Sequence, residues 1–230
     1  MRWIRKKDEP QDLLLWKRKF KNMHGRIPSY SDLNKSENLD EKRILKRSLI
    51  EEQGHICCYC CKPIGTENSH IEHIRPKEND GYRELSLEYE NLLASCQGYS
   101  DREENCGHSK GNEFDEDLFI SPLEENCESF FEFSSRGKIK AADGNQRAVY
   151  TIDKLNLDTE ALNAAREAAM WASEALLDIT EERCLFLLDK YENADKDGKY
   201  AGYSDAIVYH LKKRLKRLRQ DKPIEEAQDV

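Results

Sequence analysis

The 230-residue sequence has no apolar run that approaches the ~20 residues needed by a membrane-spanning helix. It is charged from Arg2 onward and begins with no apolar segment of the kind that directs export. We therefore expect a cytoplasmic protein without membrane contact, in a compartment where disulfide bonds do not persist. A length of 230 residues allows one large domain or two small ones, and no internal repeat or low-complexity tract is present in the sequence.

The sequence also lacks an overall positive charge. Its 37 Lys and Arg residues are outnumbered by 45 Asp and Glu residues, which gives a net charge of −8. This argues only weakly against nucleic-acid binding, which depends on local positive patches. Residues 1–26 carry nine bases against three acids, whereas residues 101–132 carry eleven acids against two bases. Six further bases and no acid lie between His210 and Arg219, where they could contact phosphates, an acidic protein surface or only water.

Cysteine, in contrast, is concentrated in one part of the chain. Four cysteines form two separated pairs, Cys57 with Cys60 and Cys96 with Cys106. Zn²⁺ prefers tetrahedral thiolate coordination, and a tight CxxC turn supplies two ligands at once. The second pair is looser, with nine residues between its members. Cys58 and Cys61 offer the CxxC spacing in a shifted register, and spacing alone does not choose between the registers. The alternative is a set of buried cysteines without a metal.

Two histidines and an acid lie between the cysteine pairs, in the sequence His-Ile-Glu-His at residues 70–73. The spacing is not that of the helical HExxH zinc motif, and the nearby Pro76 favours a short strand. Strict alternation would place His70 and Glu72 on one face of the strand and His73 on the other. A shared site for Glu72 and His73 therefore requires a twist or a bulge. The alternative is a solvated His–Glu pair without a function.

Hydrophobic periodicity predicts a largely helical chain. A helix is expected over Leu39–Gln53, with Asp40 as its N-cap and Gly54 as its C-terminal stop. Two short strands are expected within residues 56–95, followed by a helix from about Ser109. The remaining expected elements are a helix over 12–23, a hairpin around 130–139, and helices from 146 onward with a polar break at 195–199 and an amphipathic helix over 208–218.

Three segments resemble those of HNH (ββα-metal) endonucleases, namely Ile-Glu-His-Ile-Arg-Pro-Lys at 71–77, Tyr-Glu-Asn-Leu-Leu at 89–93 and Cys-Gly-His-Ser-Lys-Gly at 106–111. Residues 1–10, with the leucine run before Trp16, are similar to the start of one HNH branch. That branch comprises the PtuB-like nuclease subunits of Septu anti-phage systems, which also occur beside some retrons. The resemblance is specific over roughly residues 1–113.

The resemblance implies a mainly α fold with a small zinc-stapled ββα-metal core. On this basis we divide the chain into an N-terminal helical arm at 1–54, an HNH nuclease core at 55–120 and a C-terminal helical region at 121–230.

The resemblance also implies roles for single residues. His73 matches the general base, which deprotonates a water for attack on a phosphodiester, a role that suits imidazole because its pKa lies near neutrality. Glu72 matches an acidic metal ligand, and Asn91 matches a residue that orients the base or braces the loop. His108 matches a second metal ligand. Because Gly107 separates it from the cysteine, unlike in the commonest pattern, His108 could instead complete the zinc site.

The implied cofactors are a structural Zn²⁺ and a catalytic Mg²⁺ or Mn²⁺. Lys110 could add a phosphate contact, and His70 is a further candidate ligand. The implied partners are an AAA/ABC-type ATPase similar to PtuA, a DNA or RNA substrate and, beside a retron, its reverse transcriptase and multicopy DNA. The sequence does not distinguish DNA from RNA, because phosphate contacts carry no sequence information.

Two other functions stay open. A zinc-stabilised module could bind nucleic acid or the ATPase without cutting. A zinc hydrolase for small substrates is a third hypothesis, but no substrate-pocket signature supports it.

For the ATPase we expect a docking segment around Trp3, Leu13, Leu14 and Trp16, with Val208–Leu218 as the second candidate. The alternative is that both apolar stripes pack on the core of this chain.

Overall fold

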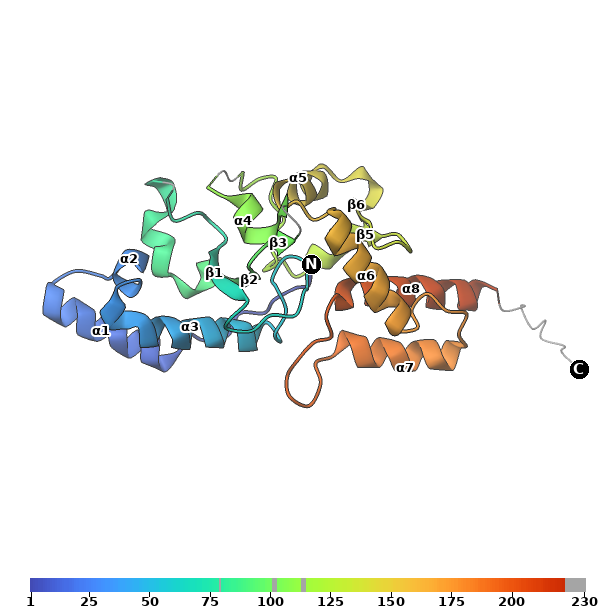
Figure 1. The fold of residues 1–230 in the computed structure, drawn as a ribbon, viewed down its shortest axis with the longest axis horizontal. Helices are drawn as coiled ribbons and strands as arrows, with labels where there is room; N and C mark the ends of the chain where they lie inside the picture. The colour runs from blue at the N-terminus through green and yellow to red at the C-terminus, as the bar shows by residue number, and fades with distance from the viewer. Residues whose placement is uncertain (79, 101–102, 113–114, 222–230) are drawn as a thin grey trace, which may run out of the picture.

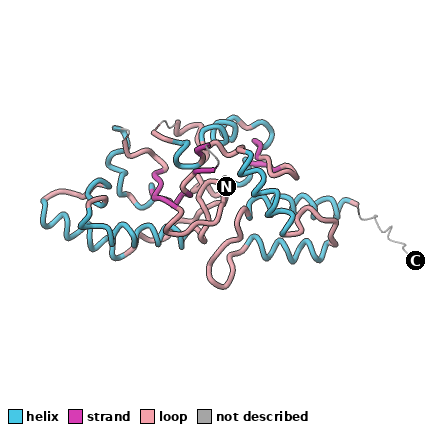
Figure 2. Tube along the Cα trace, viewed as in Figure 1, coloured by secondary structure: helices cyan, strands magenta, loops and turns pink. Residues whose placement is uncertain are grey.

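A computed structural model describes residues 1–78, 80–100, 103–112 and 115–221. Figure 1 shows an elongated molecule, with the N-terminal helices at one end and a group of C-terminal helices at the other. Short strands lie between the two ends, and helices dominate, as Figure 2 shows. The expectation of a mainly helical chain with few strands is confirmed. Among the described residues, no helix is both long enough and apolar enough to cross a membrane.

The N-terminal helices are α1 (Gln11–His24), α2 (Tyr30–Leu33) and α3 (Leu39–Glu52), with a short 3-10 helix η1 (Ser36–Asn38) between the last two. Leu13 and Trp16 of α1 are buried where it packs on α3, and the Trp16 indole donates a hydrogen bond to Asn38 Oδ1 at 3.0 Å. The expected N-cap of α3 is wrong by two positions, because Asn38 takes that place and Asp40 lies inside the first turn.

The chain leaves α3 at the buried Gln53, which fixes where the first cysteine turn begins. The Gln53 side chain accepts a hydrogen bond from the Ala94 N–H at 2.7 Å and donates one to the Ala94 carbonyl at 2.8 Å. Gly54 follows with φ of +62°, a conformation that glycine adopts without strain. The end of α3 is therefore tied directly to a central strand, and the cysteine turn starts beside that strand.

The central part contains the two expected antiparallel strands, β1 (Ser69–His73) and β2 (Leu92–Cys96). The 3-10 helices η2 (Asp80–Leu87) and η3 (Tyr89–Asn91) connect them, and β2 is followed by the hairpin of β3 (Tyr99–Ser100) with β4 (Glu103–Glu104) and by helix α4 (Cys106–Lys110). The pairing runs without interruption from Ser69 opposite Cys96 to His73 opposite Leu92. Helix α4 begins three residues before the expected Ser109.

The C-terminal part consists of a hairpin and helices. Its elements are η4 (Cys127–Phe130), β5 (Phe131–Phe133), β6 (Ile139–Ala141), η5 (Ala142–Gly144), α5 (Gln146–Lys154), α6 (Glu160–Ala172), α7 (Glu181–Glu192) and α8 (Ser204–Gln220). Helix α8 packs against α6, α7 and β5. Val208 and Leu211 are buried, and Leu215 and Leu218 pack partly buried against the same core. The apolar stripe of α8 is therefore used inside this chain.

The first ten residues form no helix and connect the two ends of the molecule. The Ile4 N–H donates to the Pro122 carbonyl at 2.8 Å, and the Arg2 guanidinium donates to the Glu192 carbonyl at 2.7 Å. Of the expected docking residues, Leu13 and Trp16 are buried in the core, whereas Trp3 keeps 38% of its surface exposed. Leu13 and Trp16 therefore pack on the core of this chain, and Trp3 is left partly exposed.

Candidate metal centre and active site

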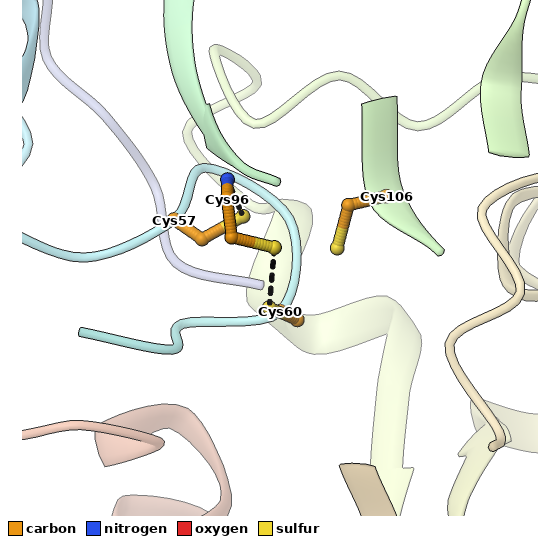
Figure 3. A group of neighbouring side chains, drawn as sticks. All are labelled: Cys57, Cys60, Cys96 and Cys106. Atoms are coloured by element: carbon orange, nitrogen blue, oxygen red, sulfur yellow. Dashed lines mark hydrogen bonds between the residues drawn. The ribbon is translucent and has the colours of Figure 1, made fainter. Parts of the chain in front are cut away.

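Three elements bring the four cysteines together. Cys57 and Cys60 lie in the turn after α3, Cys96 ends β2, and Cys106 begins α4. All four are buried, and their Sγ atoms lie within 4.8 Å of one another around a common space (Figure 3). Within the described part of the chain, no other group of three or more Cys, His, Asp or Glu side chains has its ligand atoms this close together. The register left open by the spacing is therefore Cys57 with Cys60.

The donor chemistry of this cluster fits a structural zinc ion. The Sγ atoms of Cys60 and Cys96 lie 3.8 Å apart, far beyond the ~2.05 Å of a disulfide. Burial alone would raise the pKa of the Cys57 thiol, but hydrogen bonds from neighbouring thiols bring it well below its ordinary value, which favours the thiolate. The Cys96 N–H also donates to Cys57 Sγ at 3.3 Å. Four buried sulfur ligands without a water position are typical of structural zinc sites.

Glu72, in β1, is a buried carboxylate whose two oxygens have different surroundings. Its Oε1 accepts a hydrogen bond from the Tyr59 hydroxyl at 3.0 Å and lies 2.7 Å from Lys110 Nζ. Its Oε2 lies 3.4 Å from His70 Nε2. Burial would raise the pKa of Glu72, but the Lys110 ammonium and His70 lower it to about 2. Glu72 is therefore ionised at neutral pH, with Oε1 held by the protein and Oε2 directed toward the histidine.

Gly107 keeps the space beside Glu72 Oε2 open. A Cβ atom at this position would lie 2.6 Å from His70 Nε2 and 3.0 Å from Glu72 Cδ. The next residue, His108, has its ring centroid 4.7 Å from that of His70. The glycine that departs from the commonest HNH pattern thus allows α4 to approach β1 and leaves room for a ligand. His108 lies beside His70 and is outside the cysteine cluster.

His73, the last residue of β1, lies on the opposite face of the strand from Glu72, as alternation predicts. Its Nε2 is 3.0 Å from the Ser86 carbonyl, and its ring meets the Tyr30 ring edge-on at 4.6 Å between centroids. A carbonyl can only accept, so Nε2 carries the proton and Nδ1 carries the lone pair. Burial lowers the pKa of His73 to about 4, below the near-neutral value expected from the sequence, so the imidazole is neutral and free of a proton at Nδ1 at physiological pH.

One pocket of about 300 Å³ is lined by both His73 and Glu72, together with His70 and His108. The bulge considered from the sequence is absent from β1, because its pairing with β2 is unbroken. Both residues nevertheless line the same pocket, and His73 is the last residue of the strand. The structure therefore brings together a neutral histidine, an ionised carboxylate and two more histidines.

Asn91 braces the loop between the strands. Its Oδ1 accepts from the Arg75 N–H at 2.8 Å, and its Nδ2 donates to the carbonyls of Arg75 at 3.0 Å and Leu85 at 3.2 Å. Leu85 directly precedes Ser86, the partner of His73. Of the two roles left open for Asn91, these contacts favour bracing of the loop that holds the histidine.

Lys110 is directed into the protein. Only 2% of its surface is exposed, and its Nζ donates to the carbonyls of His73 at 2.5 Å and Ile74 at 3.1 Å, besides its ion pair with Glu72. These contacts fix the end of β1 and the carboxylate. Lys110 also lines the pocket of His73 and Glu72, and its contact with a phosphate stays a prediction.

Sequence reasoning missed the contacts of Tyr59, Tyr30 and Ser86. Tyr59 lies inside the cysteine turn, and its partner Glu72 lies 13 positions further along the chain. Ser86 contributes a backbone carbonyl, which no side-chain motif can reveal.

Comparisons with known proteins agree with the motifs. No protein-family model matches the chain. It is 27% identical over 151 residues to the Retron Vc95 putative HNH endonuclease of Vibrio cholerae serotype O1 biovar El Tor, covering 63% of this chain and 72% of the relative. It is 27% identical over 139 residues to the Septu protein PtuB of Bacillus mycoides (strain KBAB4), and the match spans about half of each protein, 48% of this chain and 47% of the relative. The resemblance inferred from the sequence is thereby confirmed, and the chain is a relative of the PtuB-like HNH proteins.

Proposed function

We propose that this protein is a metal-dependent HNH endonuclease that hydrolyses phosphodiester bonds in nucleic acid. The observation that carries the proposal is the pocket in which a neutral His73 and an ionised Glu72 meet from opposite faces of one short strand. Hydrolysis of a phosphodiester needs a base for the attacking water and an anionic ligand for a cation, and these two side chains meet those needs.

The residues present fit a divalent cation beside β1. Glu72 Oε2 and His108 would hold Mg²⁺ or Mn²⁺, with His70 as a further ligand, because Gly107 leaves space next to these atoms. Such an ion, when bound, neutralises charge on the phosphate and stabilises the leaving 3′ oxygen. Two or three protein ligands suffice, since Mg²⁺ keeps several of its waters.

The chain's own residues supply the proton transfer and the alignment. His73 takes a proton from the attacking water at Nδ1, because Nε2 is occupied by the Ser86 carbonyl. Asn91 holds the loop that carries this carbonyl. Lys110 and Tyr59 hold Glu72 Oε1, so that Oε2 is the oxygen presented to the ion.

The zinc-stapled core would serve this chemistry by fixing three segments relative to one another. A zinc ion on the four cysteines joins the first cysteine turn, the end of β2 and the start of α4. The turn carries Tyr59, and α4 carries His108 and Lys110. We retain the proposed division into an arm at 1–54, a ββα-metal core at 55–120 and a C-terminal region at 121–230. The structure describes the last of these regions up to residue 221.

We further propose that the nuclease is the effector subunit of an anti-phage complex in the cytoplasm. The support is the names of the two relatives, one from a Septu system and one from a retron. The proposed partners are an AAA/ABC-type ATPase similar to PtuA and, in a retron setting, the reverse transcriptase with its multicopy DNA. The half-exposed Trp3 is the remaining N-terminal candidate for contact with the ATPase.

The proposal is tested by incubating the purified protein, with and without the neighbouring ATPase, with plasmid DNA and total RNA. Each mixture receives Mg²⁺, Mn²⁺ or no added metal, and a zinc-loaded His73→Ala variant serves as control. We expect metal-dependent cleavage of one of the two substrates by the wild type only. Binding without cleavage under every condition would overturn the nuclease proposal in favour of a zinc-stabilised binding module.

A further inference from the structure

A second pocket, separate from the one at β1, is lined by several positively charged side chains. It has a volume of about 320 Å³ and lies between the β5–β6 hairpin, the segment after α6 and one face of α8. Helix α8 contributes His210, Lys213, Arg214 and Arg217, which are spaced three, four and seven residues from the first and so share one face. Among the described residues none of the side chains lining this pocket is acidic. Figure 1 shows α8 at the opposite end of the molecule from α1.

Two of these cations lack the ion pairs that other bases of the same helix form. Lys212 Nζ lies 2.7 Å from Glu192, Arg219 Nε lies 3.0 Å from Glu181, and Arg214 pairs with the exposed Asp178. Lys213 and Arg217, in contrast, form no ion pair with any residue of the described chain. They are four positions apart on a helix, where like charges repel each other. A bound anion would remove this repulsion.

The donors that line the pocket suit a phosphate group. Ser134 and Ser135 also line the pocket, and their hydroxyl groups can donate hydrogen bonds. A guanidinium presents its N–H groups as a planar fork that suits phosphate oxygens, and an ammonium adds a point charge. The positive charge is local, since the whole chain carries a net charge of −8.

We propose that this pocket binds a phosphate of the nucleic-acid backbone away from the site of cleavage. The inference rests on the proposed nuclease function. The pocket at β1 has a volume of about 300 Å³, and the ammonium of Lys110 in its lining is already held by Glu72 and by the His73 carbonyl. Affinity for a long polyanion must then come from phosphate contacts elsewhere on the surface. The unbalanced cations of α8 supply such contacts.

The test compares two double variants of α8 in a His73→Ala background, so that binding is measured without cleavage. Lys213→Gln with Arg217→Gln alters the pocket, and Lys212→Gln with Lys216→Gln is the matched control on the same helix. Each pair removes two positive charges, from −8 to −10. Fluorescence anisotropy of labelled DNA and RNA strands is recorded over a range of salt concentrations, and thermal melting verifies that each variant folds.

We expect the pocket variant to lower the salt slope of log K by about 0.7 to 0.9, which is the value for one phosphate contact. This corresponds to a loss of roughly 4- to 6-fold in affinity at 0.15 M salt, and the control should change affinity by less than about twofold. Equal losses in both variants would show a general charge effect and overturn the proposal. Unchanged binding in the pocket variant would also overturn it and leave an acidic protein surface as the ligand.

The two proposals can fail separately. If the protein cuts neither DNA nor RNA but shows the binding pattern described above, the phosphate-pocket proposal is supported and the nuclease proposal is rejected. Cleavage by a folded protein whose pocket variant binds normally would reject the pocket alone.

Discussion

Replacement of Gly107 by alanine should remove the proposed catalytic metal site while leaving the proposed zinc site of the four cysteines in place. The added Cβ would lie 2.6 Å from His70 Nε2 and 3.0 Å from Glu72 Cδ, well inside the ~3.5 Å of a favourable contact. Glu72 cannot move away freely, because Tyr59 and Lys110 hold its other oxygen. The methyl group would therefore occupy the space that we assign to the ion.

The expected magnitudes follow from these contacts. Alanine in a helix is favoured over glycine by about 0.5–1 kcal/mol, whereas overpacking costs about 1–3 kcal/mol. The free energy of unfolding should thus fall by no more than roughly 2.5 kcal/mol. Displacement of groups that support a metal site usually costs about 10- to 100-fold in affinity, and a larger loss is expected here because Glu72 is itself a proposed ligand.

The assay is a titration with Mn²⁺ followed by electron paramagnetic resonance, with zinc content and thermal melting recorded on the same samples. Gly65→Ala is the matched control, because a Cβ there meets only Asn68 Oδ1 at 3.9 Å. The reasoning is refuted if Gly107→Ala binds Mn²⁺ as tightly as the wild type and keeps its zinc.

Three further predictions concern the surroundings of the site. Tyr59→Phe removes a hydrogen bond to the buried Glu72 carboxylate, so the free energy of unfolding in a denaturant titration should fall by about 1.5–3 kcal/mol with zinc retained; no change would show that this contact is not made. The pKa of His73 should lie near 4, below the 6.5 of an ordinary histidine, so its contribution to stability is present above pH 6.5 and is lost as the pH falls toward 4. An NMR titration of the imidazole that gives a pKa near 6.5 would contradict the burial argument. Cys60→Ser should lose zinc by elemental analysis and lose solubility, and a variant that stays fully folded without metal would argue against the structural zinc.

The parts of the site that could be predicted from sequence depend on local spacing. The CxxC turn of Cys57 and Cys60 indicated a metal centre because one turn supplies two ligands. Strand alternation placed His70 and Glu72 on one face, and the two side chains do meet there. The role of His73 came from the resemblance to HNH nucleases, because alternation alone put His73 and Glu72 on opposite faces of the strand.

The rest depends on contacts between distant segments, which spacing does not encode. The choice between cysteine registers is made by where β2 and α4 bring Cys96 and Cys106. The inward direction of Lys110 follows from its position on α4 against the end of β1, since a surface lysine has the same sequence signature. The apolar stripe of Val208–Leu218 predicted the helix, but whether it packs internally or on a partner depends on the elements around it.

The most direct test of the account is the single-turnover cleavage rate of zinc-loaded wild type against zinc-loaded His73→Ala, at saturating Mn²⁺ and on the substrate that the wild type cuts. Loss of a positioned general base should slow cleavage by ~10²–10⁴-fold, while zinc content and melting temperature stay close to those of the wild type. Cleavage at the wild-type rate by the folded, zinc-loaded variant would contradict the assignment of His73 as the base and with it the proposed active site.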